Sequence, residues 1–571
     1  MQLAKNAALA LISVVFFVLV AEGGLALLGV EPVLYERDPL VGFASRIPLY
    51  EPVEENGPVE DDHWVRRAAN KRAFFNDQRF LSKKPTNTYR VFCVGGSTTY
   101  GRPYGDVTSF CGWLRVLLPI ADPSRSWELI NSGGISYASY RVAALMEELV
   151  QYQPDLFIIY SGHNEFLEAR TYGELQESPA LLLEVRAVLN QTRIYTALGK
   201  FVDTVRGTRS GEIMNENVLP GEVETLLDDS VGLQAYRRDD HMKAGVLAHF
   251  RINLNRMIDI AESVDAGSIL VTPASNLQHC SPFKSERNTE LSDDERAAWA
   301  EWMKKARRRM KRRRFDKALA AADEAVAIDS RHAGSHYLRG QILYAASRFE
   351  EARLSFQTAI DEDVCPLRAP SESLRIVEEV AKAREVPLVE WAQYLQGRAA
   401  NGIVGEELFL DHVHSTIAAN RMLALQIIEL LHFTGEIDLA SNWGESAIAK
   451  VAAEVEGRLD PRAHARALTN LAKVFGWAGK HEEAHELAVR ALEAVDDAEA
   501  YHNAAMNSLR LGRVVEAVEY YEQVLKRSPK NAAALSDLGF ALTRLGRFES
   551  AAAALRKSLD IEDSERAHFN M

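Results

Sequence analysis

The sequence predicts an α/β protein with a three-layer αβα domain built on a parallel sheet, all-α repeat segments and an N-terminal transmembrane helix. Three observations support this fold class. Short apolar runs alternate with amphipathic helical runs, an order typical of parallel strands connected by helices. One short motif recurs at intervals of 33 or 34 residues. A long apolar stretch lies close to the N-terminus.

The composition is that of an ordinary globular protein. The 571 residues are 47% hydrophobic and 26% charged, enough for three or four domain-sized units. The net charge of −14 argues against a nucleic-acid partner, which would normally require a basic face. The run Arg307–Arg314 is a local exception, interpreted as a solvated helix face, with contact to an anionic lipid or polymer as the alternative. A CxxC spacing would indicate a zinc or redox motif, and no pair of the four cysteines has it.

Residues 7–30 are the apolar stretch and are long enough to cross a bilayer as a helix. Lys5 precedes the stretch and Glu31 follows it, so the positive-inside rule places the remainder of the chain on the periplasmic or extracellular side. The small-x-small pattern of a cleavage site is poor around Glu22. We therefore expect a single-pass, uncleaved signal-anchor, with a cleaved signal peptide or a buried core helix as the alternatives.

The elements of the predicted α/β domain follow a polar, proline-dotted stretch over residues 31–85, for which we expect irregular structure with short strands. Residues 170–240 look helical, although no residue there stands out. Strands are predicted from apolar, β-branched runs, and helices from apolar residues at helical spacing. The predicted strands cover 89–94, 127–130, 156–160, 268–272 and 387–390, and the predicted helices cover 108–118, 139–152 and 243–263.

The recurring motif occurs in two blocks. In the C-terminal block, Gly479, Gly512 and Gly546 are each followed five residues later by alanine. In the earlier block, Arg313 and Ser347 take the glycine position and are 34 residues apart. This pattern resembles the tetratricopeptide repeat, in which a small residue allows a tight turn and the alanine allows two helices to cross closely. Such repeats usually bind peptides or partner proteins, so we expect a protein partner in their groove.

These patterns divide the chain into six segments. The predicted divisions are an anchor at 1–30, a connector at 31–85, the α/β domain at 86–296 and 365–436, an inserted repeat block at 297–364 and C-terminal repeats at 437–571.

Three short segments carry residues suited to acyl chemistry. Gly95-Gly96-Ser97 follows a predicted strand, and the carboxyl ends of such strands are where open α/β sheets bind ligands. Asn164 follows another strand, and its amide could donate a hydrogen bond to a developing oxyanion. Asp411 and His414 are three residues apart before a helical pattern, so the carboxylate could orient the imidazole. The Walker spacing is absent, which argues against nucleotide binding.

Together, the segments GGSTT, SGHNE and DHVH resemble blocks I, III and V of the SGNH, or GDSL-like, hydrolase superfamily. The resemblance implies an SGNH hydrolase-like fold in which Ser97 is the nucleophile, His414 the general base and then acid, and Asp411 its orienting partner. It also makes the Ser97 N–H and Asn164 oxyanion-hole donors. His412 is the alternative imidazole. The implied chemistry needs no metal or cofactor.

Block II departs from the family pattern. The segment after the second strand is NSGGISY, residues 131–137, and the family glycine falls at Ser136, while glycines stand two and three residues earlier. A positive φ would be strained for serine, although a serine also has a backbone N–H. The second backbone donor to the oxyanion is therefore predicted to be either Ser136 or Gly134.

The combined expectation is a membrane-anchored serine esterase that cleaves an O-acyl ester of an envelope glycan or a lipid. An O-acyltransferase with the same triad is the nearest alternative. A repeat scaffold carrying an inactive SGNH domain is an alternative of a different class.

Overall fold

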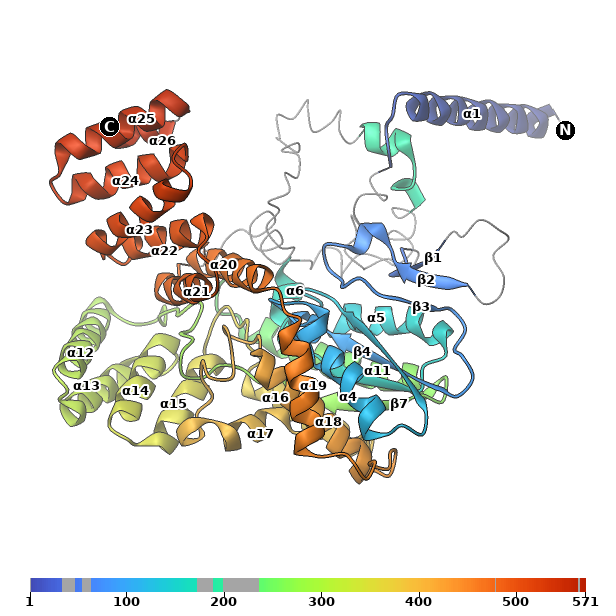
Figure 1. Cartoon of the computed structure of the whole chain (residues 1–571), viewed down its shortest axis with the longest axis horizontal. Coiled ribbons are helices and arrows are strands. Elements are labelled where there is room, and N and C mark those ends of the chain that lie inside the picture. The colour runs from blue at the N-terminus through green and yellow to red at the C-terminus, as the bar shows by residue number, and fades with distance from the viewer. Residues whose placement is uncertain are drawn as a thin grey trace.

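The computed structural model describes residues 2–32, 47–53, 63–171, 188–198, 236–477, 479–562 and 565–571. At its centre is a five-stranded sheet with the order β5-β4-β6-β7-β8, in which every neighbouring pair is parallel (Figure 1). This is the predicted parallel sheet. Its strands are β4 (Thr88–Gly95), β5 (Ser126–Gly133), β6 (Leu156–Tyr160), β7 (Gly267–Val271) and β8 (Leu388–Val389).

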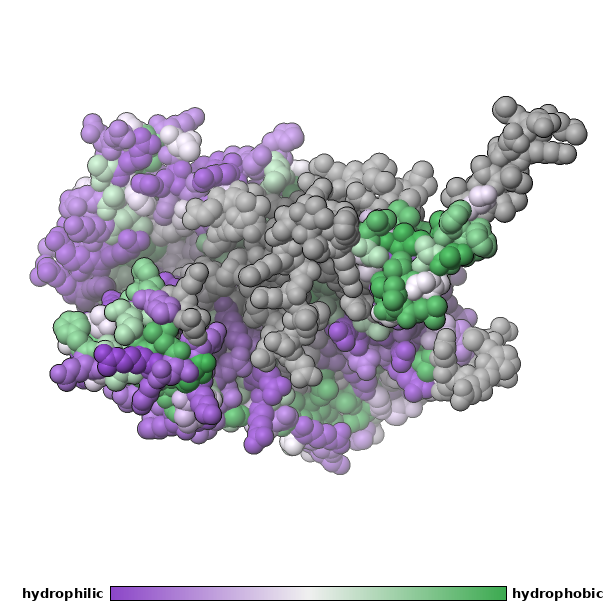
Figure 2. Space-filling model, turned by 90° about the horizontal axis from the view of Figure 1, so that it is seen from above, coloured by the Kyte–Doolittle hydropathy of each residue, from purple (hydrophilic) through white to green (hydrophobic). Residues whose placement is uncertain are grey.

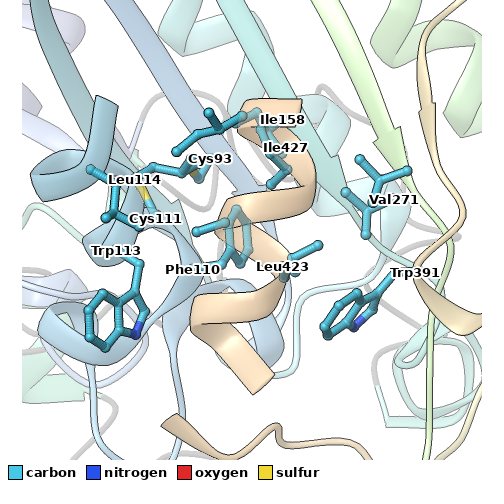
Figure 3. Packing of buried hydrophobic residues seen from close by; sticks show 14 of the residues in the cluster. Cys93, Phe110, Cys111, Trp113, Leu114, Ile158, Val271, Trp391, Leu423 and Ile427 are labelled. Carbon is cyan, nitrogen blue, oxygen red and sulfur yellow. The ribbon is translucent and has the colours of Figure 1, made fainter. Parts of the chain in front are cut away.

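Helices cover both faces of this sheet, which explains why its strands read as continuous apolar runs. Successive side chains of a strand point to opposite faces, so Val91 and Cys93 join one core while Phe92 and Val94 join the other. Figure 3 shows part of the first core, where Cys93 lies among side chains from helices on that face. The first face is covered by α4 (Phe110–Ala121), α17 (Trp391–Arg398) and α18 (Ile417–Phe433), and the second by α5 (Ser139–Leu149), α11 (Asp240–Glu262) and α16 (Ser371–Ala383).

A small antiparallel sheet lies in the stretch that the sequence presents as a connector. It consists of β1 (Tyr50–Pro52), β2 (Trp64–Arg67) and β3 (Arg79–Leu81). The Phe80 ring packs edge-on against Tyr50, Phe92 and Tyr152, with ring centroids 4.8–5.8 Å apart. The expected short strands are therefore present, and they add an aromatic cluster to the second core.

Both repeat blocks are helical hairpins, as predicted. The left-handed turns at Gly479, Gly512 and Gly546 have φ of 73–79°, and Arg313 and Ser347 take the same conformation in the inserted block, with φ of 55° and 59°. The inserted block contains α12 (Asp293–Lys311), α13 (Phe315–Ile328), α14 (Ala333–Ala345) and α15 (Phe349–Asp361). After α19 (Glu445–Gly457) come α20 (Pro461–Trp477), α21 (His481–Ala494), α22 (Ala498–Arg510), α23 (Val514–Arg527), α24 (Ala532–Arg544), α25 (Phe548–Ile561) and α26 (Glu565–Asn570).

The N-terminal stretch forms α1 (Gln2–Leu27). Within the described ranges, no helix combines the length and the hydropathy needed to span a membrane, so the transmembrane helix expected over residues 7–30 is not found. Glu22 interrupts the apolar stretch, and its carboxylate accepts hydrogen bonds from the backbone N–H groups of Arg193 (3.0 Å) and Ile194 (2.9 Å). Of the region predicted to be helical at 170–240, residues 172–187 and 199–235 lie outside the described residues.

Candidate active site

Ser97 lies at the carboxyl end of β4, where the strand turns into the short helix α3 (Ser97–Tyr100). Gly95 has φ of 154°, and a Cβ there would lie 2.0 Å from the carbonyl oxygen of Tyr160. A Cβ on Gly96 would lie 2.5 Å from the Asn164 side-chain nitrogen. Glycine is therefore required at both positions, because the backbone passes too close to Tyr160 and Asn164 for a side chain. This close passage brings Ser97 next to Asn164, which follows the neighbouring strand β6.

Asp411 and His414 lie in a tight turn before α18. The turn is closed by a bridge between Phe409 and Ser415, and by the Asp411 carboxylate, which accepts hydrogen bonds from the backbone N–H groups of Val413 (2.8 Å) and His414 (2.7 Å). The second carboxylate oxygen of Asp411 lies 2.5 Å from His414 Nδ1. On the opposite side of the ring, His414 Nε2 lies 2.7 Å from Ser97 Oγ. Three predicted residues, separated by up to 317 positions, are thus in one hydrogen-bonded chain.

The electrostatics of this chain favour an ionised Asp411 beside an imidazole. Burial would raise the pKa of Asp411, but the neighbouring rings of His414 and His412 and the hydrogen bonds from His414 outweigh it and hold the pKa well below its ordinary value. A carboxylate that stays ionised can orient an imidazole and stabilise its protonated form.

His412 occupies a different position from His414. Its Nδ1 lies 3.5 Å from the Asp411 carboxylate, and its ring packs against Phe283 and Phe475. It is His414 whose Nε2 lies within hydrogen-bond distance of Ser97 Oγ. This geometry favours His414 over the alternative imidazole.

His163, the third histidine near Asp411, is buried in block III. Burial, followed by the nearby His412 and His414, lowers its pKa to about 3, so it is neutral at physiological pH. Its Nδ1 accepts a hydrogen bond from the backbone N–H of Ala369 at 3.2 Å.

The predicted oxyanion donors differ in what their N–H groups already bind. The Gly134 N–H donates to the Gly95 carbonyl at 2.9 Å, so this hydrogen is already used in a bond to the end of β4. Ser136 is fully buried with φ of 62°, and no hydrogen bond among the described residues uses its backbone N–H. The Asn164 side-chain amide donates to the Tyr137 carbonyl at 3.0 Å and has a second hydrogen available. The arrangement favours Ser136 over Gly134 as the second backbone donor.

A buried ion pair holds the block II loop. Arg141 Nε lies 2.6 Å from the Glu168 carboxylate, and another guanidinium nitrogen donates to the Ser136 carbonyl at 2.5 Å. Glu168 also accepts from the Ala138 N–H at 2.9 Å. The sequence patterns did not predict this ion pair. Glu168 lies one helical turn after Glu165, and this spacing could have indicated that both carboxylates face the same neighbouring loop.

Asn276 holds the turn that carries Asp411. Its backbone N–H donates to the His412 carbonyl at 2.9 Å and its side-chain amide to the Asp411 carbonyl at 3.1 Å. The Asn276 carbonyl accepts from the buried Arg368 at 2.9 Å. Neither residue was predicted. The position of Asn276 beyond the carboxyl end of β7 is a signal that could have identified it.

Comparisons with known proteins place the repeats in a family. Residues 303–363 and 508–569 match models of the tetratricopeptide repeat, which confirms the repeats predicted from spacing. None of the curated proteins matches the chain. The chain thus combines tetratricopeptide repeats with an α/β unit built on a parallel sheet.

Several solved structures are similar to this chain. The lipase/acylhydrolase from Enterococcus faecalis is 11% identical with a TM-score of 0.27, covering 62% of this chain and 100% of that one. A catalytic mutant of the acetylxylan esterase Axe2 from Geobacillus stearothermophilus is 12% identical with a TM-score of 0.26, covering 60% and 94%. The tetratricopeptide repeat protein YrrB is 15% identical with a TM-score of 0.18, covering 47% and 88%. At these values, activity has to be inferred from the site itself.

Proposed function

We propose that this protein is a serine esterase of the SGNH type, with Ser97 as nucleophile, His414 as general base and Asp411 as its orienting partner. The observation that carries the proposal is the hydrogen-bonded chain from Ser97 Oγ through both ring nitrogens of His414 to the Asp411 carboxylate. A nucleophile within reach of a base that is itself oriented by a third group is the general signature of covalent acyl transfer.

In the proposed reaction, His414 Nε2 takes the Ser97 proton while Ser97 Oγ attacks the ester carbonyl. The resulting oxyanion is held by the backbone N–H groups of Ser97 and Ser136 and by the Asn164 amide. As the tetrahedral intermediate collapses, His414 returns the proton to the departing alcohol, which leaves an acyl-enzyme. Water then attacks the acyl-enzyme while His414 takes its proton, and His414 returns that proton to Ser97 Oγ as the bond to the acyl group breaks and the carboxylic acid leaves.

We propose a membrane-proximal substrate, an O-acylated envelope glycan or a lipid, because α1 presents large apolar side chains to its surroundings. Phe16, Phe17 and Leu19 are 62%, 71% and 65% exposed. Figure 2 shows apolar residues gathered in green where α1 joins the body of the molecule. Contiguous apolar surface of this kind is costly in water and usually marks an interaction site.

Attachment to a membrane through residues 7–30, with the Ser97 site on the non-cytoplasmic side, is part of the proposal. Fractionation of cells expressing the full chain or a chain lacking residues 2–27 tests it. The full chain should sediment with membranes and be degraded by external protease, and the shortened chain should lose the attachment. Recovery of the full chain in the soluble cytoplasmic fraction would contradict it.

We also propose that the C-terminal repeats bind a protein partner, supported by the repeat-family match over 508–569. A photocrosslinking residue in place of Phe540, an exposed aromatic of α24, should capture that partner in cells. Recovery of the uncrosslinked chain alone, from cells in which the enzyme is active, would argue against a partner on this face.

The esterase proposal is tested by hydrolysis of para-nitrophenyl acetate and longer acyl esters by the full chain. Ser97→Ala should lower turnover more than about a thousandfold, because the nucleophile is removed. Ser268→Ala is the matched control, since Ser268 is another buried serine, on β7, and should leave turnover unchanged. The chain-length profile separates acetyl from lipid substrates.

Labelling by a fluorophosphonate completes the test. Absence of both turnover and labelling at Ser97 would contradict a serine hydrolase and favour the scaffold. Labelling at Ser97 without turnover would indicate an acyltransferase that requires its acceptor alcohol.

A further inference from the structure

The first C-terminal repeat hairpin, α20–α21, packs directly on the loops that carry the site residues. Leu410, the residue before Asp411, and Cys280 belong to the same buried apolar cluster as Leu468 and Phe475 of α20. Figure 1 shows this hairpin lying between the remaining C-terminal repeats and the α/β unit. The hairpin is therefore in contact with the site and not only tethered to the domain.

On the His414 side, contact runs through His412. The ring centroid of His412 lies 5.7 Å from that of His414 and 5.9 Å from that of Phe475 on α20. Phe283 lies on the same ring, 5.1 Å away. Phe475 is 2% exposed, so the contact is within the protein interior, where a change in volume is felt by the neighbours.

On the Ser97 side, contact runs through Tyr104, in the turn that follows α3. Its ring stacks on His464 of α20 with centroids 4.2 Å apart and an interplanar angle of 15°. Its hydroxyl oxygen lies 3.1 Å from His464 Nε2. One helix of the repeats thus touches both the turn after the nucleophile and the turn that carries the base.

Lys480, in the turn between α20 and α21, fastens the hairpin. Its ammonium donates to the Ser281 carbonyl at 2.5 Å and hydroxyl at 2.9 Å, and lies 4.4 Å over the Phe283 ring. The side chain is 6% exposed. A lysine is seldom buried unless its charge is satisfied, so these contacts indicate a specific docking of the repeats.

We infer that the α20–α21 hairpin is part of the catalytic unit and that Phe475 is a positioning residue, which acts through His412 to hold the His414 ring against Ser97. This inference rests on the proposed serine esterase function. The Phe475 ring packs against the ring of His412, which lies against the ring of His414, and this series of rings is the path that we assign to the effect. A displacement of about 1 Å in the base can cost about a hundredfold in rate.

The test compares full-length Phe475→Leu with Phe356→Leu in the hydrolysis of para-nitrophenyl acetate. Phe356 is the matched control, because it is an equally buried phenylalanine in the inserted repeats. Phe475→Leu should lower kcat by about tenfold or more with little change in KM, since positioning and not binding is lost. Phe356→Leu should change neither.

A double-mutant cycle with His412→Ala separates positioning from general destabilisation. If Phe475 acts through His412, Phe475→Leu should have little further effect on kcat in the His412→Ala background. Equal losses of kcat in both backgrounds, or an unchanged kcat in a Phe475→Leu variant that unfolds at the temperature of the wild type, would overturn the inference. Lack of turnover and of labelling in the wild type would instead overturn the esterase function itself.

Discussion

Ser136 combines backbone strain with an unused hydroxyl at the proposed oxyanion hole. Its φ of 62° costs a residue with a Cβ about 1–2 kcal/mol relative to glycine. Its buried Oγ has no hydrogen-bond partner among the described residues. We therefore expect Ser136→Gly to raise the free energy of unfolding by about 1 kcal/mol. Because the proposed donor is the backbone N–H, which glycine retains, kcat/KM for para-nitrophenyl acetate should stay within about twofold.

Ser136→Ala is the control for this prediction, because alanine removes the hydroxyl but keeps the strain. Loss of fluorophosphonate labelling on heating measures unfolding of the site directly. A Ser136→Gly variant that unfolds at a lower temperature than Ser136→Ala would show that the strain is compensated elsewhere.

At the scale of elements, Glu165 joins the first turn of α6 (Glu165–Thr171) to the start of α5. Its carboxylate accepts from the Ser139 hydroxyl at 2.6 Å and N–H at 3.1 Å, and from the Ser161 hydroxyl at 3.4 Å. Burial raises the pKa of Glu165 to about 7. The hydrogen bonds from Ser139 oppose this rise, and the negative charge of nearby Glu168 adds to it. An acid whose pKa is higher in the folded chain holds its proton more tightly there, so stability falls as pH rises from about 4.5 to about 7.

This linkage predicts that Glu165→Gln, which cannot ionise, weakens the pH dependence of stability. The ionisation of Glu165 should account for up to about 3 kcal/mol between pH 4.5 and 7.5. The measurement is the unfolding temperature of both chains across that range. Glu379→Gln, at an exposed carboxylate on α16, should leave the wild-type slope unchanged. An equal slope in wild type and Glu165→Gln would contradict the assignment.

The elements themselves were largely predictable, because periodicity is a local property. The predicted strand 156–160 has the same bounds as β6. The predicted strand 127–130 stops short of the end of β5 at Gly133, because the last three residues of β5 are polar or small and do not continue the apolar run. The resemblance of three short motifs to the SGNH superfamily predicted Ser97, His414 and Asp411 as one set, and the structure places these three residues in one hydrogen-bonded chain. The positions of Glu168 and Asn276 could have marked them as candidates, but their partners Arg141 and Asp411 are 27 and 135 residues away, and a local pattern does not identify such partners.

At the scale of the whole molecule, both repeat blocks are bound to the α/β unit by specific polar contacts. The inserted block is held where Arg331 pairs with Asp240 of α11 at 2.7 Å, and where the Tyr337 hydroxyl donates to the Gln278 carbonyl at 2.7 Å. The C-terminal block is held by Lys480 and by the aromatic contacts of α20. Repeats fixed in this way can present a partner to the site at a defined distance.

Docking of the C-terminal repeats should depend on Lys480 more than on any exposed cation of the same helices. Lys480→Met keeps the length of the side chain but removes the ammonium donor to the part-buried Ser281 carbonyl and hydroxyl, which costs about 1–3 kcal/mol. Because α20 contacts the turns of both Ser97 and His414, the loss should be felt at the site as well as in the repeats. Hydrogen exchange should therefore accelerate in residues 461–494 and in residues 408–416 together.

Lys473→Met provides the comparison, since Lys473 lies on α20 and pairs with Glu499 at the surface. Exposed ion pairs contribute about 0–1 kcal/mol, so this variant should exchange like the wild type. Faster exchange confined to residues 461–494 in Lys480→Met would mean that the hairpin can loosen without disturbing the site, and that the two units are only neighbours. Faster exchange in both regions, with a parallel fall in kcat, would mean that any ligand able to shift α20 can also change the rate of ester hydrolysis.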